Sequence, residues 1–185
     1  MKKSIFMIIV ISLILITLQG CLFFGNSIGD SVPVVDFVDL QKYTGKWYEI
    51  SSLPTWFAND LVCVTATYLL RENGTIKVVN QGYKNSPEGE LDSISGTAWV
   101  LDESQPARLR VSFFPLISSQ YNIIALDEEN YTYAMVTGST YDFLWILSRT
   151  PQMNQDIYNM LIQQAEDWGY DIDNLEMTPQ ICPDI

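Results

Sequence analysis

The sequence contains no histidine, and its 10 basic side chains are outnumbered by 22 acidic ones, for a formal net charge of −12. The absence of histidine removes the commonest general base, the usual haem ligand and the Ser–His and Cys–His nucleophile pairs. The shortage of basic side chains argues against binding of nucleic acid and against electrostatic docking on anionic lipid, because both need a basic patch. We expect neither a metal nor an organic cofactor.

Long apolar runs are also scarce, and the N-terminus carries the one that stands out. Two lysines precede an almost wholly apolar segment, residues 4–19, and residues 18–21 (LQGC) resemble the bacterial lipobox. A charged start followed by an apolar centre is typical of an export signal. An uncleaved membrane anchor is the alternative, but spanning a bilayer takes roughly 17 to 25 apolar residues and this run is at or below that limit. We predict a lipoprotein signal peptide at 1–20, acylation of Cys21 (palmitate among the chains) and, in a Gram-negative host, anchorage to the outer membrane.

Only three cysteines are present, Cys21, Cys63 and Cys182. If Cys21 carries lipid, the other two form an even pair in an oxidising compartment, where a disulfide is expected. Two buried free thiols are the alternative. The spacing of the three cysteines matches no metal site.

The mature chain would have 165 residues and a net charge of −14, because Lys2 and Lys3 leave with the signal peptide. This length suits one domain. Residues 21–35 contain Gly, Ser and Pro and are predicted to form an acylated tether, followed by the domain at 36–185.

The domain shows the pattern of an all-β protein. Short β-branched and aromatic runs alternate with turn signals at intervals of about 8–14 residues. Eight strands joined by hairpin-length connections predict an up-and-down antiparallel barrel, which has no sheet edges and can hold one small ligand. The predicted strands are 45–52, 62–71, 75–85, 91–101, 107–114, 119–127, 131–138 and 142–149.

One α-helix is expected after the strands. Thr150 is the predicted N-cap, Pro151 the first helical residue and Gly169 the residue that ends the helix. An apolar stripe at helical spacing predicts that the helix packs on the barrel wall. The stripe consists of Ile157, Leu161, Ala165 and Trp168.

Several motifs resemble those of the lipocalin family. Residues 45–50 (GKWYEI) are similar to the signature of the family's first strand, and residues 141–151 (YDFLWILSRTP) to its second and third motifs run together. Tyr141 and Phe143 depart from the usual residues of the second motif. With residues 37–43, 64–68 and 121–127, the resemblance covers about 36–180. It is strongest toward the bacterial lipocalins, which are outer-membrane lipoproteins, and toward the apolipoprotein D branch.

The resemblance implies structural roles for four residues. Trp47 would plug the closed end of the barrel with Arg149 over its ring, a cation–π contact worth about 0.5–2 kcal/mol. Cys63 and Cys182 match the positions of a disulfide in the apolipoprotein D branch.

The resemblance also implies a ligand site inside the barrel. Tyr68, Asn80 and Trp145 match pocket positions of the apolipoprotein D branch, and alternation from them turns neighbouring residues inward. For any single aromatic, core packing is the alternative, and Asn80 would bind either a ligand head group or neighbouring backbone. The remaining expected ligand contacts are Ala66, Val78, Gly82, Ser112, Phe114, Tyr121 and Ile123.

The function implied by the resemblance is storage or transport of fatty acids or lysophospholipids for envelope maintenance. One acyl chain would enter the barrel, and a lysine at the mouth, such as Lys84, would pair with a fatty-acid carboxylate. Two alternatives stay open: an enzyme of the same fold that uses the Cys63 thiol, and a ligand-free surface protein that acts through partner contacts. The sequence leaves a homodimer open.

Overall fold

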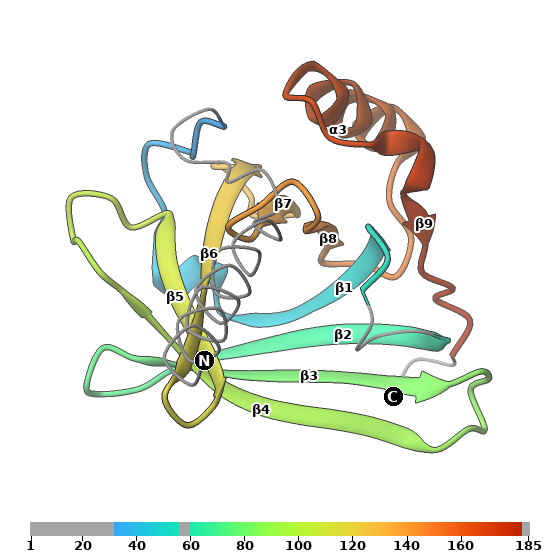
Figure 1. Cartoon of the computed structure of the whole chain (residues 1–185), viewed down its shortest axis with the longest axis horizontal. Coiled ribbons are helices and arrows are strands. Elements are labelled where there is room, and N and C mark those ends of the chain that lie inside the picture. Colours follow the sequence, from blue (N-terminus) through green and yellow to red (C-terminus); the bar gives the residue numbers. More distant parts are fainter. Residues whose placement is uncertain (1–31, 56–59, 183–185) are drawn as a thin grey trace, which may run out of the picture.

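The computed structural model describes residues 32–55 and 60–182, and they form a closed antiparallel barrel of eight strands with one C-terminal helix (Figure 1). Every strand lies within two residues of its predicted bounds, so the predicted fold is confirmed. Consecutive strands pair from β2 to β8, and β1 pairs with both β8 and β2. The strands are β1 (Gly45–Ser52), β2 (Leu61–Leu70), β3 (Ile76–Lys84), β4 (Leu91–Val100), β5 (Arg108–Phe114), β6 (Ile117–Leu126), β7 (Tyr133–Thr137) and β8 (Leu144–Ser148).

The barrel closes between β1 and β2 over a short distance only. Residues 45–48 of β1 pair with 65–68 of β2, and beyond that point the two strands diverge. β4 likewise pairs with β5 only through residues 97–100. As a result, β2, β3 and β4 run on together as a flat extension beyond the closed part of the barrel (Figure 1).

The C-terminal segment, residues 176–182, fills the gap where β1 and β2 diverge. Its first two residues form β9 (Glu176–Met177), which pairs with the end of β1. Further along, the Gln180 amide donates from Nε2 to the carbonyl oxygen of Glu49 at 2.8 Å and to that of Val64 at 2.9 Å. One side chain thus links the two strands across the gap.

A disulfide between Cys63 and Cys182 fixes the end of this segment. The backbone N–H of Cys63 also donates to the carbonyl oxygen of Pro179, at 2.8 Å. Cys63 has a positive φ of 57°, and the pairing of β2 with β3 shifts register between Val62 and Thr65. This bulge turns the Cys63 side chain toward the C-terminal segment. The expected disulfide is confirmed.

The helix α3 (Gln155–Asp167) begins later than predicted. Asn154 is the N-cap, and its Oδ1 accepts from the N–H groups of Asp156 and Ile157. The Thr150 hydroxyl instead donates to the carbonyl oxygen of Gln152, at 2.6 Å. The prediction of Thr150 as N-cap was therefore wrong, because its side chain closes a local turn before the helix.

The end of α3 agrees with the prediction. Gly169 adopts a φ of +91°, which an L side chain rarely tolerates. Its N–H donates to the carbonyl oxygen of Glu166 and the N–H of Tyr170 to that of Ala165, at 2.9 and 3.0 Å. These two bonds form a Schellman motif that satisfies the last carbonyl groups of the helix.

Two apolar cores hold the domain together. One fills part of the barrel interior, and the other lies between α3 and the outer faces of β6, β7 and β8. Leu161 and Ala165 are fully buried in the second core, with Ile157 and Trp168 packed against it, so the predicted packing of the helix on the wall is confirmed.

The domain begins earlier than the predicted boundary at residue 36. Val32 is 2% exposed in the core under the helix, and the N–H of Val35 donates to the carbonyl oxygen of Ile123.

The short helix α2 (Leu40–Tyr43) and the 3-10 turn η2 (Ile172–Asn174) complete the secondary structure. Among the described residues no helix has the length and apolar character to cross a membrane.

Candidate functional site

The closed end of the barrel is built around Trp47 and Arg149. The Trp47 side chain has no exposed surface, and the guanidinium carbon of Arg149 lies 3.8 Å from its ring centroid. Arg149 also donates to the carbonyl oxygens of Tyr131, Lys46 and Lys42, at 3.1, 3.0 and 2.7 Å. The guanidinium therefore ties three segments together and seals this end, in the arrangement that the resemblance implied.

A network of three tyrosines fills the interior next to the closed end. The Tyr121 hydroxyl shares hydrogen bonds with those of Tyr43 and Tyr68, at 2.7 and 2.8 Å. Burial raises the pKa of Tyr68 to about 12 and the pKa values of Tyr43 and Tyr121 well above their usual range. The hydroxyls consequently stay protonated and satisfy one another.

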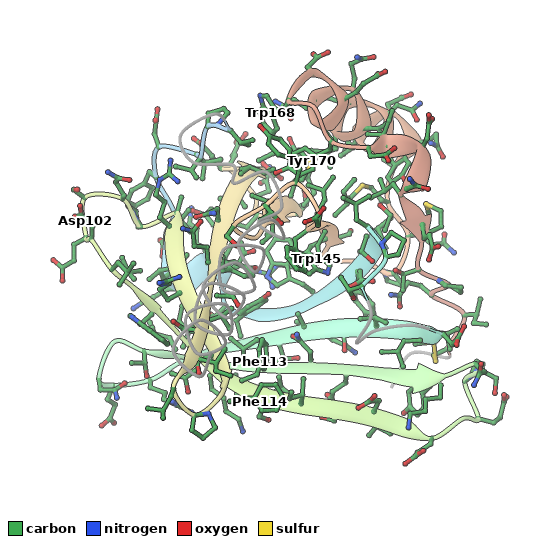
Figure 2. The ribbon with its side chains drawn as sticks, in the orientation of Figure 1. Asp102, Phe113, Phe114, Trp145, Trp168 and Tyr170 are labelled. Carbon is green, nitrogen blue, oxygen red and sulfur yellow. A yellow bond between two sulfur atoms is a disulfide. The ribbon has the colours of Figure 1, made fainter. Side chains whose placement is uncertain are left out.

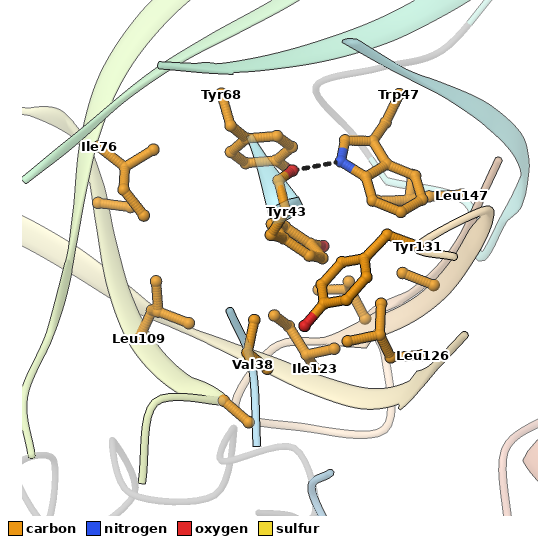
Figure 3. Close-up of a cluster of buried hydrophobic side chains, with 14 of the residues drawn as sticks. Val38, Tyr43, Trp47, Tyr68, Ile76, Leu109, Ile123, Leu126, Tyr131 and Leu147 are labelled. Carbon is orange, nitrogen blue, oxygen red and sulfur yellow. Dashed lines mark hydrogen bonds between the residues drawn. The ribbon is translucent and has the colours of Figure 1, made fainter. Parts of the chain in front are cut away.

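Four of the expected ligand contacts lie in this packed region. Tyr68 and Ile123, both labelled in Figure 3, are 5% and 0% exposed. Val78 is 3% exposed, and Tyr121 packs against the same core. They face the barrel interior, as expected, but other side chains already fill the space around them. This part of the barrel is a core rather than an open pocket.

Asn80 and Trp145 lie further from the closed end. Asn80 sits between Ala66 of β2 and Ile94 of β4, and its Oδ1 is buried with no hydrogen-bond partner among the described residues. The ring of Trp145 (Figure 2) stacks on that of Phe143. The ring centroids lie 5.8 Å apart, and the ring planes are 16° from parallel. The Ala66 side chain, opposite Asn80 on β2, is small. Trp145 packs against the interior core, and Asn80 adds one unsatisfied acceptor to the same barrel.

The space beside Gly82 is occupied by protein. A Cβ at this position would lie 3.1 Å from Cγ2 of Val64 and 3.3 Å from Cβ of Leu61. The absence of a side chain at Gly82 thus lets β2 pack closely and leaves no space there for a ligand.

The expectation that Ser112 and Phe114 face the interior was wrong. The inward residues of β5 are Leu109, Val111 and Phe113, which pack on the interior core. The Ser112 hydroxyl instead donates to the carbonyl oxygens of Phe114 and Ile117, and the Phe114 ring is 61% exposed. The alternation of apolar and polar residues over 108–113 (RLRVSF) already indicated this orientation.

Glu49 of the GKWYEI segment is an interior residue that was not among the expected ligand contacts. It pairs across the sheet with Leu147, whose side chain lies in the interior core, so both point inward. Its Oε1 accepts from the hydroxyls of Ser52 and Thr178, at 3.1 and 2.7 Å. Burial raises the pKa of the Glu49 carboxyl, and the two hydrogen bonds oppose this shift.

The lysine expected at the mouth of the barrel already has an acidic partner. The Lys84 ammonium, which was expected to pair with a fatty-acid carboxylate, forms an ion pair with Glu90 at 3.0 Å on the exposed rim. Within residues 32–55 and 60–182 no group of three or more carboxylate or thiol side chains is placed to hold a metal.

Replacing Glu49 by glutamine tests its buried position. Because the pKa of Glu49 is raised in the folded state, the folded protein holds this proton more tightly than the unfolded chain. Wild-type stability should fall as the pH rises through the folded pKa, whereas the Glu49→Gln variant loses this dependence. In thermal melts between pH 4 and pH 8, the melting temperature of the variant should rise relative to that of the wild type as the pH increases. The exposed Glu72→Gln variant is the control, and equal profiles for both variants would contradict the buried position.

Comparison with known proteins adds evidence to this geometry. A family model described as a lipocalin-like domain matches residues 38–180. The chain is 39% identical over 160 residues to the outer membrane lipoprotein Blc of Vibrio cholerae, covering 86% of this chain and 91% of the relative. It is 39% identical to mouse apolipoprotein D over 163 residues, 83% of this chain and 84% of the relative. Insecticyanin from the tobacco hornworm Manduca sexta shares the fold, with a TM-score of 0.66, 19% identity and coverage of 84% of this chain and 87% of that one.

Proposed function

This chain belongs to the lipocalin family, and from that premise we propose that its barrel carries a single-chain lipid, a fatty acid or a lysophospholipid, for envelope maintenance. The acyl chain would lie against Trp145 and Phe143, beside Ala66. Removing the chain from water contributes about 25 cal/mol per Å² of apolar surface. Named relatives support the location: the Vibrio cholerae protein is called an outer membrane lipoprotein, which agrees with the location expected from the lipobox.

The observation that carries the proposal is the unpartnered Oδ1 of Asn80. A buried acceptor without a donor costs about 1–3 kcal/mol, so a bound molecule that offers a donor recovers this energy. A lysophospholipid offers a hydroxyl group close to its acyl chain, and a protonated fatty acid offers its carboxyl O–H. An ionised fatty acid offers no donor. We therefore propose lysophospholipids as the favoured cargo at neutral pH.

The anchor is part of the same proposal. Cys21 and the signal peptide lie outside the described residues, so their roles remain as proposed from the sequence. Acylated Cys21 would hold the barrel beside the membrane that supplies its cargo. Stable anchoring takes more than one acyl chain, because a single chain gives only marginal, reversible binding.

Replacing Asn80 by leucine tests the ligand site. The variant should be as stable as the wild type or more stable without ligand, because it removes an unsatisfied buried acceptor. Its affinity for a palmitoyl lysophospholipid should fall about 10-fold or more, the consequence of losing one buried hydrogen bond. Calorimetric titration with the lysophospholipid and a thermal melt of the ligand-free protein measure the two effects.

The matched control is Gln81→Leu, because Gln81 is the next residue along β3 and points to the opposite face of the sheet. Native mass spectrometry after gentle extraction adds an independent readout, since co-purified lipid supports a carrier. Two results together would overturn the proposal. Native mass spectrometry would show no co-purified lipid, and the titrations would show the same lysophospholipid affinity for wild type, Asn80→Leu and Gln81→Leu.

The enzyme alternative has lost its proposed nucleophile. Cys63 is bonded to Cys182, so it carries no thiol in this structure. Its sulfur also faces the C-terminal segment rather than Asn80 and Trp145. These observations support binding over catalysis.

A further inference from the structure

Basic side chains gather on one outer face of this acidic protein. Val78, Ala98 and Leu109 point into the interior core, so their neighbours along β3, β4 and β5 point outward. These outward positions include Lys77, Arg108 and Arg110 and no acidic residue. With Arg71 at the end of β2, four of the eight basic residues that follow Cys21 share this region. We call it the basic wall.

A hollow of about 320 Å³ opens on the basic wall. Arg71 and Lys77 line it, together with Thr97, Ser112 and Phe114. The Arg71 guanidinium donates to the Thr97 hydroxyl at 3.3 Å, which leaves further N–H groups of the fork for an anion. The hollow thus combines two cations and hydroxyl groups with an aromatic rim.

An exposed apolar tip adjoins the hollow. The turn between β5 and β6 carries Phe114, Leu116 and Ile117, which are 61%, 106% and 65% exposed, with Pro115 between the first two. Figure 2 shows Phe114 at the edge of the molecule beside β4. Apolar groups flanked by cations are typical of segments that enter the interface of a membrane.

Acidic residues gather on the opposite side. Asp156, Glu166 and Asp167 lie on α3, and Asp171 and Asp173 follow it. In Figure 1, α3 lies across the molecule from the turn between β5 and β6. The net charge argued against docking on anionic lipid, but it is a property of the whole chain, whereas the outward strand positions of the basic wall carry basic and no acidic side chains.

We propose that the basic wall and the apolar tip dock together on the surface of an anionic phospholipid bilayer. Leu116 and Ile117 enter the interface, and Arg71 and Lys77 bind lipid phosphates. A second copy fits this face less well, because two-fold symmetry would bring like charges together. The eleven peptide links from Cys21 to Val32 reach roughly 35–40 Å when extended, enough for the anchored domain to turn this face to the membrane. The docking is independent of the cargo.

The test places a dye on the tip of the full protein. Leu116→Cys, labelled with an environment-sensitive nitrobenzoxadiazole dye, is reconstituted into vesicles of phosphatidylethanolamine and phosphatidylglycerol. The expected result is a blue shift of the emission, because the dye enters the interface. Met160→Cys on α3 is the matched control, since Met160 is an exposed apolar residue on the opposite side and its label should stay in water.

Charge removal completes the test. Replacing Arg71 and Lys77 by serine in the labelled protein should reduce the docked-to-free ratio roughly 25-fold, about 5-fold per cation. Raising the salt concentration to 0.5 M should act in the same direction. Equal emission from the labels at 116 and 160 would overturn the proposal. So would a shift that persists in pure phosphatidylcholine and grows with protein density, because a second copy would then cover the tip.

Discussion

Replacing both Cys63 and Cys182 by alanine should lower the free energy of unfolding by about 4–5 kcal/mol. The disulfide joins residues 119 positions apart, and cross-links that close long loops restrict the unfolded chain most. Urea denaturation of the wild type and the double variant measures the difference. A loss of this size is a large part of the stability of a small domain.

The disulfide also holds the C-terminal segment between β1 and β2. In the double variant the segment keeps only hydrogen bonds, so the amide of Thr178, which donates to the carbonyl oxygen of Ile50, should exchange faster with solvent. Gln180→Leu is the control, because it removes two hydrogen bonds and retains the disulfide, at an expected cost of about 1–2 kcal/mol. Unchanged protection of Thr178 in the double variant would show that the hydrogen bonds alone hold the segment.

Replacing Arg149 by methionine should cost about 3–5 kcal/mol, since four donated hydrogen bonds and one ring contact disappear together. The carbonyl oxygens that lose a donor belong to Lys42, Tyr43, Lys46 and Tyr131. Methionine keeps much of the side-chain volume, so the loss reports on the guanidinium rather than on packing. Equilibrium denaturation measures the effect.

Arg149→Lys separates charge from geometry at the same site. In the wild type the guanidinium carbon of Arg149 lies 3.8 Å from the centroid of the Trp47 ring. A lysine ammonium keeps the positive charge near this ring, but it lacks the planar fork that donates to several carbonyl groups. We expect it to recover less than half of the lost stability. A double-mutant cycle with Trp47→Phe should assign about 0.5–2 kcal/mol to the cation–π contact. A cost below 1 kcal/mol for Arg149→Met would contradict a central role in closing the barrel.

The fold could be predicted because its signals are local. Alternating apolar residues and turn residues such as Asn73-Gly74 define each strand over a few positions. The placement of the C-terminal segment could not be predicted in this way. Its contacts join residues 178–180 to residues 49–64, and no periodicity in either region encodes them.

The interior was harder to predict than the fold. Counting along the strands places Asn80 and Trp145 in the barrel, but it does not reveal which inward side chains fill the space. The hydroxyl network of Tyr43, Tyr68 and Tyr121 depends on two strands, β2 and β6, and the short helix α2 meeting at one point. The buried carboxylate of Glu49 likewise accepts a hydrogen bond from Thr178, which lies more than a hundred residues away in the sequence.

The position of the C-terminal segment has a consequence for the order of assembly. In a chain exported N-terminus first, β1 emerges early, and residues 176–182 emerge only after all eight barrel strands. These residues cover the edge of the second half of β1. Contacts between such distant residues form slowly, and an unpaired strand edge invites aggregation in the meantime. A chain that ends before Glu176 would keep this edge open for good. Residues 176–182 therefore cover the exposed edge of β1 only when the chain has been exported as far as these residues.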